Sequence, residues 1–298
     1  VQYAKQDLTK RLNEKQKKQI QKVTGKFLYN ARSVYCIIMH ALNELNIAAS
    51  DPTEETQKDL EHFLDYVATH PEAQIIYRAS DMQLEVDCDA AYLVAPKARS
   101  RAAGYHYLGN HDGNLFNGPI YVLAKVIKAV MTSAAEAENE SIFINGGEAV
   151  PFIKTLEELG HKQKPVRLRT DNNTASGINN GTIKKLKSKK WDMHDWWIKD
   201  RIEQGQFKVE WSKGKHSLSD YFSKKHPSSH HKAVRPIYNY EPGVSPTSLQ
   251  GCIEILDRAH SANRKCAVPI NRLDTRQQAS KDPNLRLANL LLDKAFKH

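Results

Sequence analysis

Apolar and polar residues alternate in several short runs of this chain, and elsewhere apolar residues recur every three or four positions. Alternation predicts strands that each bury one face. We expect them at 84–90, 102–108, 119–131, 166–170 and 206–211, with a further short strand at 74–77. The helical spacing predicts a long helix from Ala134 to Leu159 that stops at Gly160, because glycine suits the left-handed cap of a helix. Strands followed by alternating helices and strands predict an α/β fold, a mixed five-stranded sheet with flanking helices.

The pattern also divides the chain into three parts. Residues 1–79 carry helical apolar spacing, and Asp51-Pro52-Thr53-Glu54 is a helix start, so we expect a small helical segment before the sheet. Residues 80–226 hold the predicted strands. Prolines and serines after His226 predict a linker and a poorly ordered tail over 227–298, in which residues 282–296 could form a short amphipathic helix.

The charge of the chain indicates what kind of partner it binds. The 298 residues include 44 Lys+Arg against 34 Asp+Glu, a net charge of +10, which favours a polyanionic partner. Between residues 184 and 235 there are fourteen Lys/Arg against six Asp/Glu, and a second basic cluster runs from 5 to 26. The candidates for gripping a nucleic-acid backbone are Lys184, Lys185, Lys187, Lys189 and Lys190. Trp191, Trp196 and Trp197 follow on the same predicted helix, where tryptophan is more often core than a stacking platform.

Cysteine and histidine usage points away from disulfides and zinc. The four cysteines show no paired spacing, and there is neither a signal peptide nor a long apolar span, so we expect an intracellular, reduced, soluble protein without a membrane partner. His226, His230 and His231 have no accompanying cysteine pair, which disfavours a zinc site. The chain begins at Val1 without methionine, and we expect it to be an internal piece of a longer protein.

Four acidic residues occur in contexts that alternate between strand-like and helix-like sequence. They are Asp89, Glu136, Asp171 and Asp220. Each alone has an ordinary explanation as a turn former, a helix cap or part of a capping box. Together they indicate a metal site, because carboxylates gathered from separate elements repel one another unless cations join them. Two Mg²⁺ ions about 3.5–4 Å apart, bridged by such acids, are typical of phosphodiester hydrolysis.

A resemblance makes this expectation specific. Three motifs, in this order, resemble the ribonuclease H domain of copia-type retrotransposon polyproteins. They are Ser133-Ala134-Ala135-Glu136-Ala137-Glu138, Thr170-Asp171-Asn172 and Ser219-Asp220-Tyr221-Phe222-Ser223-Lys224. The resemblance implies a ribonuclease H-like fold over 80–226, preceded by the end of a reverse transcriptase thumb and connection over 1–79. It also implies that Asp89, Glu136, Asp171 and Asp220 hold two Mg²⁺ ions, with Mn²⁺ as a substitute.

The same resemblance implies a substrate and a setting. The expected substrate is an RNA–DNA hybrid whose RNA strand is cut during reverse transcription, with the remainder of the reverse transcriptase polyprotein as partner. The expected location is a cytoplasmic virus-like particle, or the nucleus. The family's polymerase site is a Tyr-x-Asp-Asp turn, which this sequence lacks, so we expect no polymerase active site in this chain.

Two alternative functions stay open at this level. The chain could be an integrase- or transposase-type nuclease, although those place the glutamate last and here Glu136 is second. It could be a catalytically silent or domesticated fragment that only binds nucleic acid.

Within the first strand, Glu85, Asp87 and Asp89 share one face. The small neighbours Ala90 and Ala91 favour Asp89 as the ligand, so we expect Asp87 to tune the field or pair with a lysine, and Asp87→Asn to retain most activity.

Overall fold

The computed structural model describes residues 7–183 and 189–265, which fall into two compact units. The smaller unit contains residues 7–74 and the larger contains residues 75–263. The division lies between Gln74 and Ile75, whereas the sequence suggested one between residues 79 and 80. No helix in the described ranges combines the length and the apolar character needed to cross a membrane.

The smaller unit is helical. Its elements are α1 (Glu14–Ser33), the 3₁₀ helix η1 (Cys36–Ile38), α2 (Met39–Ala48) and α3 (Glu54–Thr69). α1 begins with a capping box at Asn13, and α3 begins with one at Thr53. Each cap side chain accepts from the backbone N–H three residues on, and the side chain of that third residue accepts from the backbone N–H of the cap. Ile20, Leu42 and Leu60 are buried between these helices.

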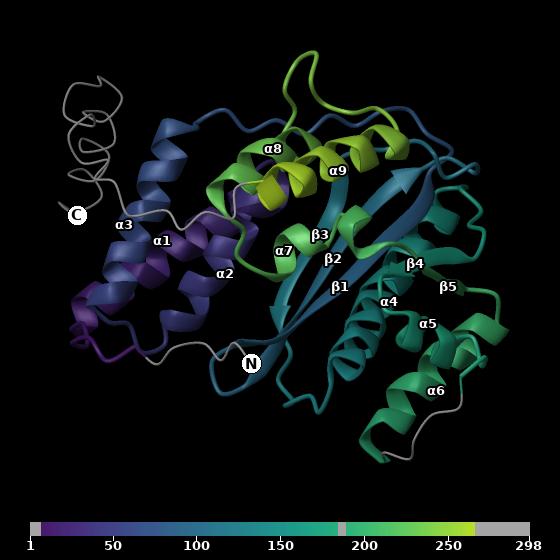
Figure 1. The fold of residues 1–298 in the computed structure, drawn as a ribbon, viewed down its shortest axis with the longest axis horizontal. Coiled ribbons are helices and arrows are strands. Elements are labelled where there is room, and N and C mark those ends of the chain that lie inside the picture. The colour runs from purple at the N-terminus through teal and green to yellow at the C-terminus, as the bar shows by residue number, and fades with distance from the viewer. Residues whose placement is uncertain (1–6, 184–188, 266–298) are drawn as a thin grey trace. The chain divides into compact units, whose positions relative to one another are not determined.

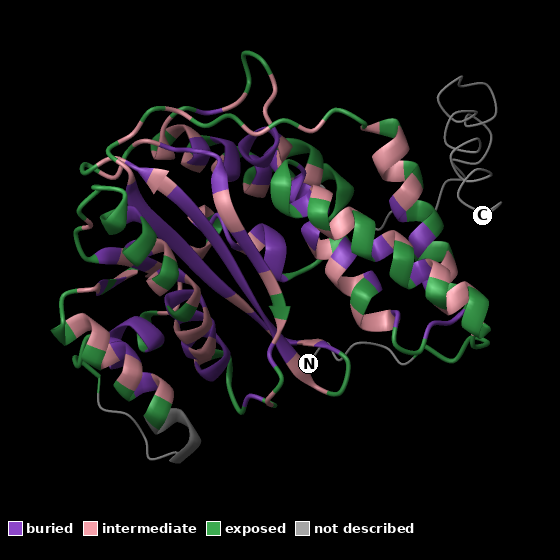
Figure 2. Ribbon diagram, turned by 180° about the vertical axis from the view of Figure 1, so that it is seen from behind, coloured by how far each residue is buried: buried purple, intermediate pink, exposed green. Residues whose placement is uncertain are grey.

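The larger unit is built on a mixed five-stranded sheet, which confirms the predicted α/β class (Figure 1). Its strands are β1 (Gln83–Ala95), β2 (Arg99–Gly109), β3 (Pro119–Val126), β4 (Val166–Thr170) and β5 (Phe207–Trp211). Their order is β3-β2-β1-β4-β5, with β1–β2 and β2–β3 antiparallel and β1–β4 and β4–β5 parallel. The strand expected at 74–77 was wrong, because those residues have no regular structure. Figure 2 shows that β1 and β2 are buried over most of their length.

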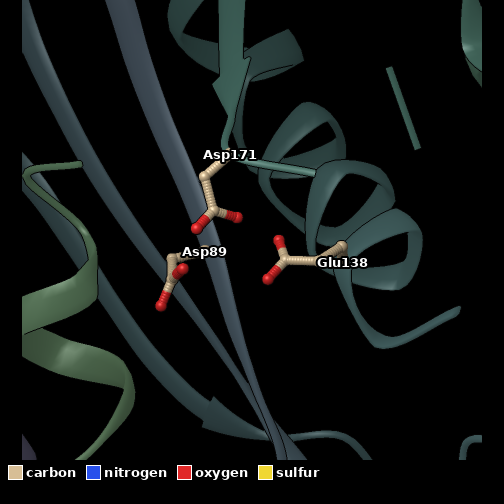
Figure 3. Close-up of side chains that lie close together, drawn as sticks. All are labelled: Asp89, Glu138 and Asp171. Carbon is tan, nitrogen blue, oxygen red and sulfur yellow. The ribbon is translucent and has the colours of Figure 1, made fainter. Parts of the chain in front are cut away.

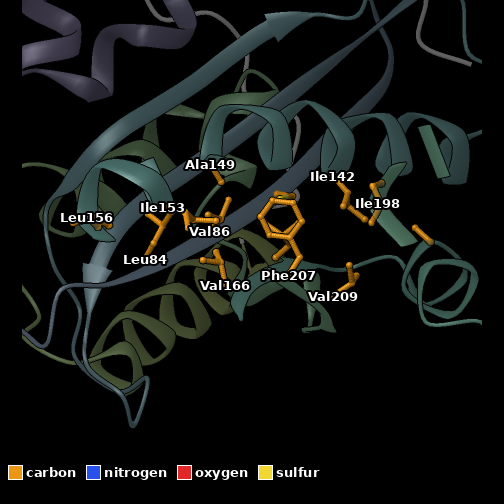
Figure 4. Packing of buried hydrophobic residues seen from close by; sticks show 13 residues of the cluster. Leu84, Val86, Ile142, Ala149, Ile153, Leu156, Val166, Ile198, Phe207 and Val209 are labelled. Carbon is orange, nitrogen blue, oxygen red and sulfur yellow. The ribbon is translucent and has the colours of Figure 1, made fainter. Parts of the chain in front are cut away.

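One face of the sheet packs against three helices. They are α4 (Ala134–Glu158), α5 (Asn173–Asn179) and α6 (Lys189–Glu203). Leu84, Val86 and Cys88 of β1 point into the apolar cluster on this face, together with residues of α4 and β4 (Figure 4). Gly104 of β2 allows α4 to come this close, since a Cβ there would overlap the side-chain amide of Asn145. Gly160 has a φ of 91°, the left-handed conformation expected where α4 ends.

The opposite face of the sheet is covered by the C-terminal part of the larger unit. Its elements are η2 (Gly214–His216), α7 (Asp220–Ser223), α8 (Ser228–Tyr238) and α9 (Leu249–Lys265). The linker and poorly ordered tail expected from residue 227 were therefore wrong for residues 228–238 and 249–265, which form helices. The amphipathic faces of α8 and α9 bury Val234, Tyr238, Cys252 and Leu256. The helix considered at 282–296 lies outside the described residues.

Candidate metal centre

Three carboxylates meet at the end of the parallel strand pair β1–β4. One oxygen from each of Asp89, Glu138 and Asp171 lies within 4.8 Å of the others (Figure 3). The register explains two of them. Asp87 of β1 lies opposite Arg169 of β4, so Asp89 and Asp171, each two residues further along, reach the same level of the sheet. The sequence expectation that Asp89 and Asp171 come together therefore matches the geometry.

The third carboxylate is Glu138, and the expectation of Glu136 needs correction. Glu138 accepts hydrogen bonds from the backbone N–H of Ala90 at 3.1 Å and from the hydroxyl of Thr170 at 3.4 Å. The carboxylate of Glu136 instead accepts from the backbone N–H and the hydroxyl of Thr132, ahead of the helix start. Two residues are about 200° apart around a helix, so Glu136 and Glu138 cannot both face β1.

A signal in the sequence could have identified Glu138. It lies three, seven and eleven residues before Ser141, Asn145 and Ala149, which line the side of α4 that faces the sheet. The hydroxyl of Ser141 donates to the carbonyl oxygen of Asp89 at 2.7 Å, and the amide of Asn145 donates to the carbonyl of Ala103 at 3.0 Å. These contacts fix the rotation of α4 and direct Glu138 toward β1.

Asp220 lies beside this group and outside its tight cluster. It opens α7, and its carboxylate is ion-paired with Lys224 and 3.7 Å from Nε2 of His226. Its negative charge still reaches Asp89 and Asp171, and it raises the pKa of both. The structure thus brings the fourth predicted acid near the other three without making it a member of their group.

Burial and mutual repulsion make the carboxylates reluctant to ionise. Burial, aided by the charges of Asp220 and Asp171, raises the pKa of Asp89 from 3.8 to about 7, against the opposing effects of a Ser223 hydrogen bond and Lys224. Burial and the neighbouring Asp89 raise the pKa of Glu138 well above its ordinary value. Clustered carboxylates that resist ionisation alone are suited to a divalent cation, which offsets their repulsion.

Asp87 does not join the group. Its carboxylate is ion-paired with Arg169 and accepts a hydrogen bond from the backbone N–H of Leu218 at 3.1 Å. The sequence suggests that Asp87 tunes the field or pairs with a lysine, and its partner in the structure is an arginine of the adjacent strand. Arg169 also contacts Glu85 at 3.1 Å and donates to the hydroxyl of Tyr107 at 2.9 Å.

The predicted nucleic-acid contacts fall mostly outside the described part of the chain. Lys184, Lys185 and Lys187 lie there, and so do the side chains of Lys189, Lys190 and Trp191. Trp197 packs against the core, as tryptophan at helical spacing commonly does. Trp196 is 66% exposed, with the ammonium of Lys199 5.4 Å from its ring centre.

No family model matches this chain, and no curated protein matches it either. Several solved structures are similar to it. The N-terminal RNase H domain of a Mycobacterium tuberculosis protein, solved as a fusion with maltose-binding protein, has 13% identity over 48% of this chain and 91% of its own, with a TM-score of 0.35.

Two further structures extend the comparison. An RNase H recovered from compost and solved with an RNA/DNA hybrid has 12% identity over 47% of this chain and 92% of its own, with a TM-score of 0.33. The foamy viral protease-reverse transcriptase, solved with double-stranded DNA, has 15% identity over 72% of this chain and 46% of its own, with a TM-score of 0.38. The structures similar to this chain thus include RNase H domains and a viral protease-reverse transcriptase.

Proposed function

We propose that this protein is a metal-dependent ribonuclease H that cleaves the RNA strand of RNA–DNA hybrids. The observation that carries the proposal is the meeting of Asp89, Glu138 and Asp171, with Asp220 alongside. The order of these acids along the chain supports the assignment. The glutamate comes second, on the helix between β3 and β4, whereas integrase-type nucleases place it last.

The carboxylates fit Mg²⁺ or Mn²⁺. Hard oxygen ligands from three separate elements suit these cations. Burial, and then repulsion between the carboxylates, raises the pKa of Asp89 and of Glu138, and a bound cation would oppose both effects. We propose that Asp89, Glu138 and Asp171 hold the metal and that Asp220 completes a two-ion site. Bound divalent cations would lower the pKa of water and stabilise charge on a phosphodiester.

The protein's own groups prepare the site for a phosphate. Asp89 and Glu138 are buried, and Asp171 is the most exposed of the three, so substrate approaches from the side of Asp171. Lys224 adds a positive charge next to Asp220 and lies within electrostatic reach of Asp89 and Asp171. Hydrogen bonds from Ala90 and Thr170 hold the Glu138 carboxylate in place.

A basic helix face in the smaller unit offers a second contact with a polyanion. Lys15, Lys18, Lys22 and Lys26 of α1 are all exposed, at spacings of three and four residues that place them along one side of the helix. Phosphate neutralisation by such a row is independent of base sequence. We expect hybrid recognition to rest on backbone shape and 2′-hydroxyl groups, so cleavage should depend little on sequence.

We also propose the biological setting that the sequence motifs indicate. The chain would act within a copia-type retrotransposon reverse transcriptase, with the remainder of that polyprotein as its partner. Cytoplasmic virus-like particles are the expected place of action, with the nucleus as a further one.

The test is a cleavage assay on labelled duplexes. The purified chain should cut the RNA strand of a hybrid in Mg²⁺ or Mn²⁺, stop in EDTA, and leave double-stranded DNA intact. Asp89→Asn should bind the hybrid without cutting it. Hybrid binding without cleavage by the wild-type chain would indicate a silent nucleic-acid-binding fragment. Metal-dependent cutting of DNA in place of RNA would indicate an integrase-type nuclease.

A further inference from the structure

We propose that Asp87 is a positioning residue that holds the segments leading to Asp171 and Asp220 against β1. It would thereby set the geometry of the acidic group without binding the metal itself. This inference rests on the proposed metal site. It also changes the expectation from the sequence that Asp87 tunes the local field or pairs with a lysine.

The two oxygens of Asp87 contact two different segments. Oδ1 accepts from Nε of Arg169 on β4, and Oδ2 accepts from the backbone N–H of Leu218 at 3.1 Å. Arg169 is two residues before Asp171, and Leu218 is two residues before Asp220. One carboxylate on β1 therefore connects to both chain segments that deliver the later acids.

Each of these contacts lies only two residues along the chain from an acid of the proposed metal site, so it can affect the position of that acid. Asp87 itself lies two residues before Asp89, on the same face of β1, where such neighbours are about 6.5–7 Å apart. The three links Asp87–Asp89, Arg169–Asp171 and Leu218–Asp220 thus each span two residues and share Asp87 as their anchor. A shift at the anchor is transmitted over only two residues to each acid.

The Leu218 peptide is held from both sides. Its N–H donates to Asp87, and its carbonyl oxygen accepts from the hydroxyl of Tyr238 on α8 at 2.8 Å. The Leu218 side chain is fully buried. The segment before Asp220 belongs to no strand, so these two hydrogen bonds and that burial hold it in place of the strand pairing that fixes Asp87 and Arg169.

The anchor is costly to bury, which argues that its contacts are specific. Asp87 is only 4% exposed, and a buried carboxylate is tolerated when it is paired and hydrogen-bonded. Glu85 provides the comparison. It lies on the same face, is 2% exposed and is ion-paired with Arg167 and Arg169, both on β4. Glu85 therefore shares the burial and the charge of Asp87, and its ion pairs run to β4 alone.

The experiment compares Asp87→Ala with Glu85→Ala in the full chain. Mn²⁺ affinity is measured by titration calorimetry, and the exchange rate of the Leu218 amide is measured by hydrogen exchange. Asp87→Ala should weaken Mn²⁺ binding about 10–100-fold, the usual effect of losing a group that orients metal ligands. It should also speed Leu218 exchange by about tenfold or more, since the amide loses a charged acceptor. Glu85→Ala keeps both contacts of Asp87, so it should leave Leu218 exchange close to wild type and weaken Mn²⁺ binding much less than Asp87→Ala does.

The conservative variant Asp87→Asn should have an intermediate effect on Mn²⁺ affinity. Asp87→Asn has a single acceptor oxygen and can keep only one of the two contacts, so its Mn²⁺ affinity should fall between wild type and Asp87→Ala. If Asp87→Ala does not fold, Tyr238→Phe replaces it. That variant removes the other hydrogen bond to the Leu218 peptide and should weaken Mn²⁺ binding several-fold.

The outcomes separate this inference from the proposed function. Equal effects of Asp87→Ala and Glu85→Ala on Mn²⁺ affinity, or unchanged Leu218 exchange, would overturn the positioning role. A wild-type chain that binds no Mn²⁺ would overturn the metal site instead. Leu218 exchange would then still decide whether Asp87 holds the segment before Asp220.

Discussion

Gly214 packs directly against the carboxylate of Asp171. A Cβ at residue 214 would overlap Oδ2 of Asp171 and lie 3.2 Å from its Cγ. Gly214→Ala should therefore turn the Asp171 side chain away from Asp89 and Glu138. We expect Mg²⁺-dependent hybrid cleavage to fall about 10–100-fold, the range seen when ligand orientation is disturbed.

The matched control for this substitution is Gly147→Ala. Gly147 is exposed on α4, and a Cβ there meets nothing within 4 Å. Alanine in a helix should stabilise the fold by roughly 0.5–1 kcal/mol and leave cleavage unchanged. Equal cleavage by both variants would show that Asp171 tolerates a side chain at residue 214.

A second prediction separates the two glutamates of α4. Glu138→Gln should abolish metal-dependent cleavage, because it removes one of the three clustered carboxylates. Glu136→Gln should retain most activity and lower the free energy of unfolding by up to about 1 kcal/mol, since Glu136 bonds Thr132 at the helix start. Cleavage rates and thermal melts of the two variants measure both effects. The opposite pattern would restore the sequence assignment of Glu136.

The raised pKa of Asp89 predicts how the metal-free protein responds to pH. The folded state keeps a proton on Asp89 up to about pH 7, whereas the unfolded chain releases it near 3.8. Between these values the folded state binds more protons, so the free energy of unfolding should fall as pH rises, by an amount on the order of a few kcal/mol.

Urea titrations from pH 4 to 8 in EDTA measure this dependence. Asp89→Asn should make it shallower, because one of the carboxylates with a raised pKa is gone while Glu138 and Asp171 remain. Saturating Mg²⁺ should also flatten it, because a bound cation stabilises the ionised carboxylates. A stability that rose with pH across this window in the wild-type chain would contradict the predicted sign.

The C-terminal helices should contribute to the stability of the larger unit. Leu256 of α9 is 4% exposed, so Leu256→Ala should lower the free energy of unfolding by about 2–5 kcal/mol. Val244 is 55% exposed, and Val244→Ala should change it by no more than about 0.5 kcal/mol. Denaturant unfolding compares the two. A small effect at Leu256 would agree with the linker expected from the sequence.

The lysines on the basic face of α1 should contribute to the salt dependence of hybrid binding. Replacing Lys18, Lys22 and Lys26 with Gln should flatten the slope of log K against log salt by roughly 0.9 per lost phosphate contact. Lys58→Gln is the control, since Lys58 is already 3.5 Å from Glu55 on α3. An unchanged slope in the triple variant would mean that this face is only solvated.

The local sequence was sufficient to predict the elements whose apolar residues follow a strong strand or helix periodicity. The five strands and the long helix α4 lie close to their predicted positions, because alternation and helical spacing record which side of each element is buried. The same reasoning failed for α8 and α9. Pro236 within α8, and Pro242 and Pro246 between the two helices, suggest a linker. The helical spacing of the apolar residues of α9, Cys252, Ile255, Leu256 and Ala259, was outweighed by that signal, although the structure buries all four.

The sequence motifs and their resemblance also indicated that the carboxylates of Asp89 and Asp171 should meet, whereas the parallel pairing of β1 and β4 that brings them together is seen only in the structure. The resemblance assigned Glu136, and the helical spacing that points to Glu138 does not by itself overrule that assignment. Only the tertiary structure decided, through the contacts of Ser141 and Asn145 that set the rotation of α4 on the sheet. The role of Asp87 was likewise beyond local reasoning, because its partner Leu218 is 131 residues away along the chain.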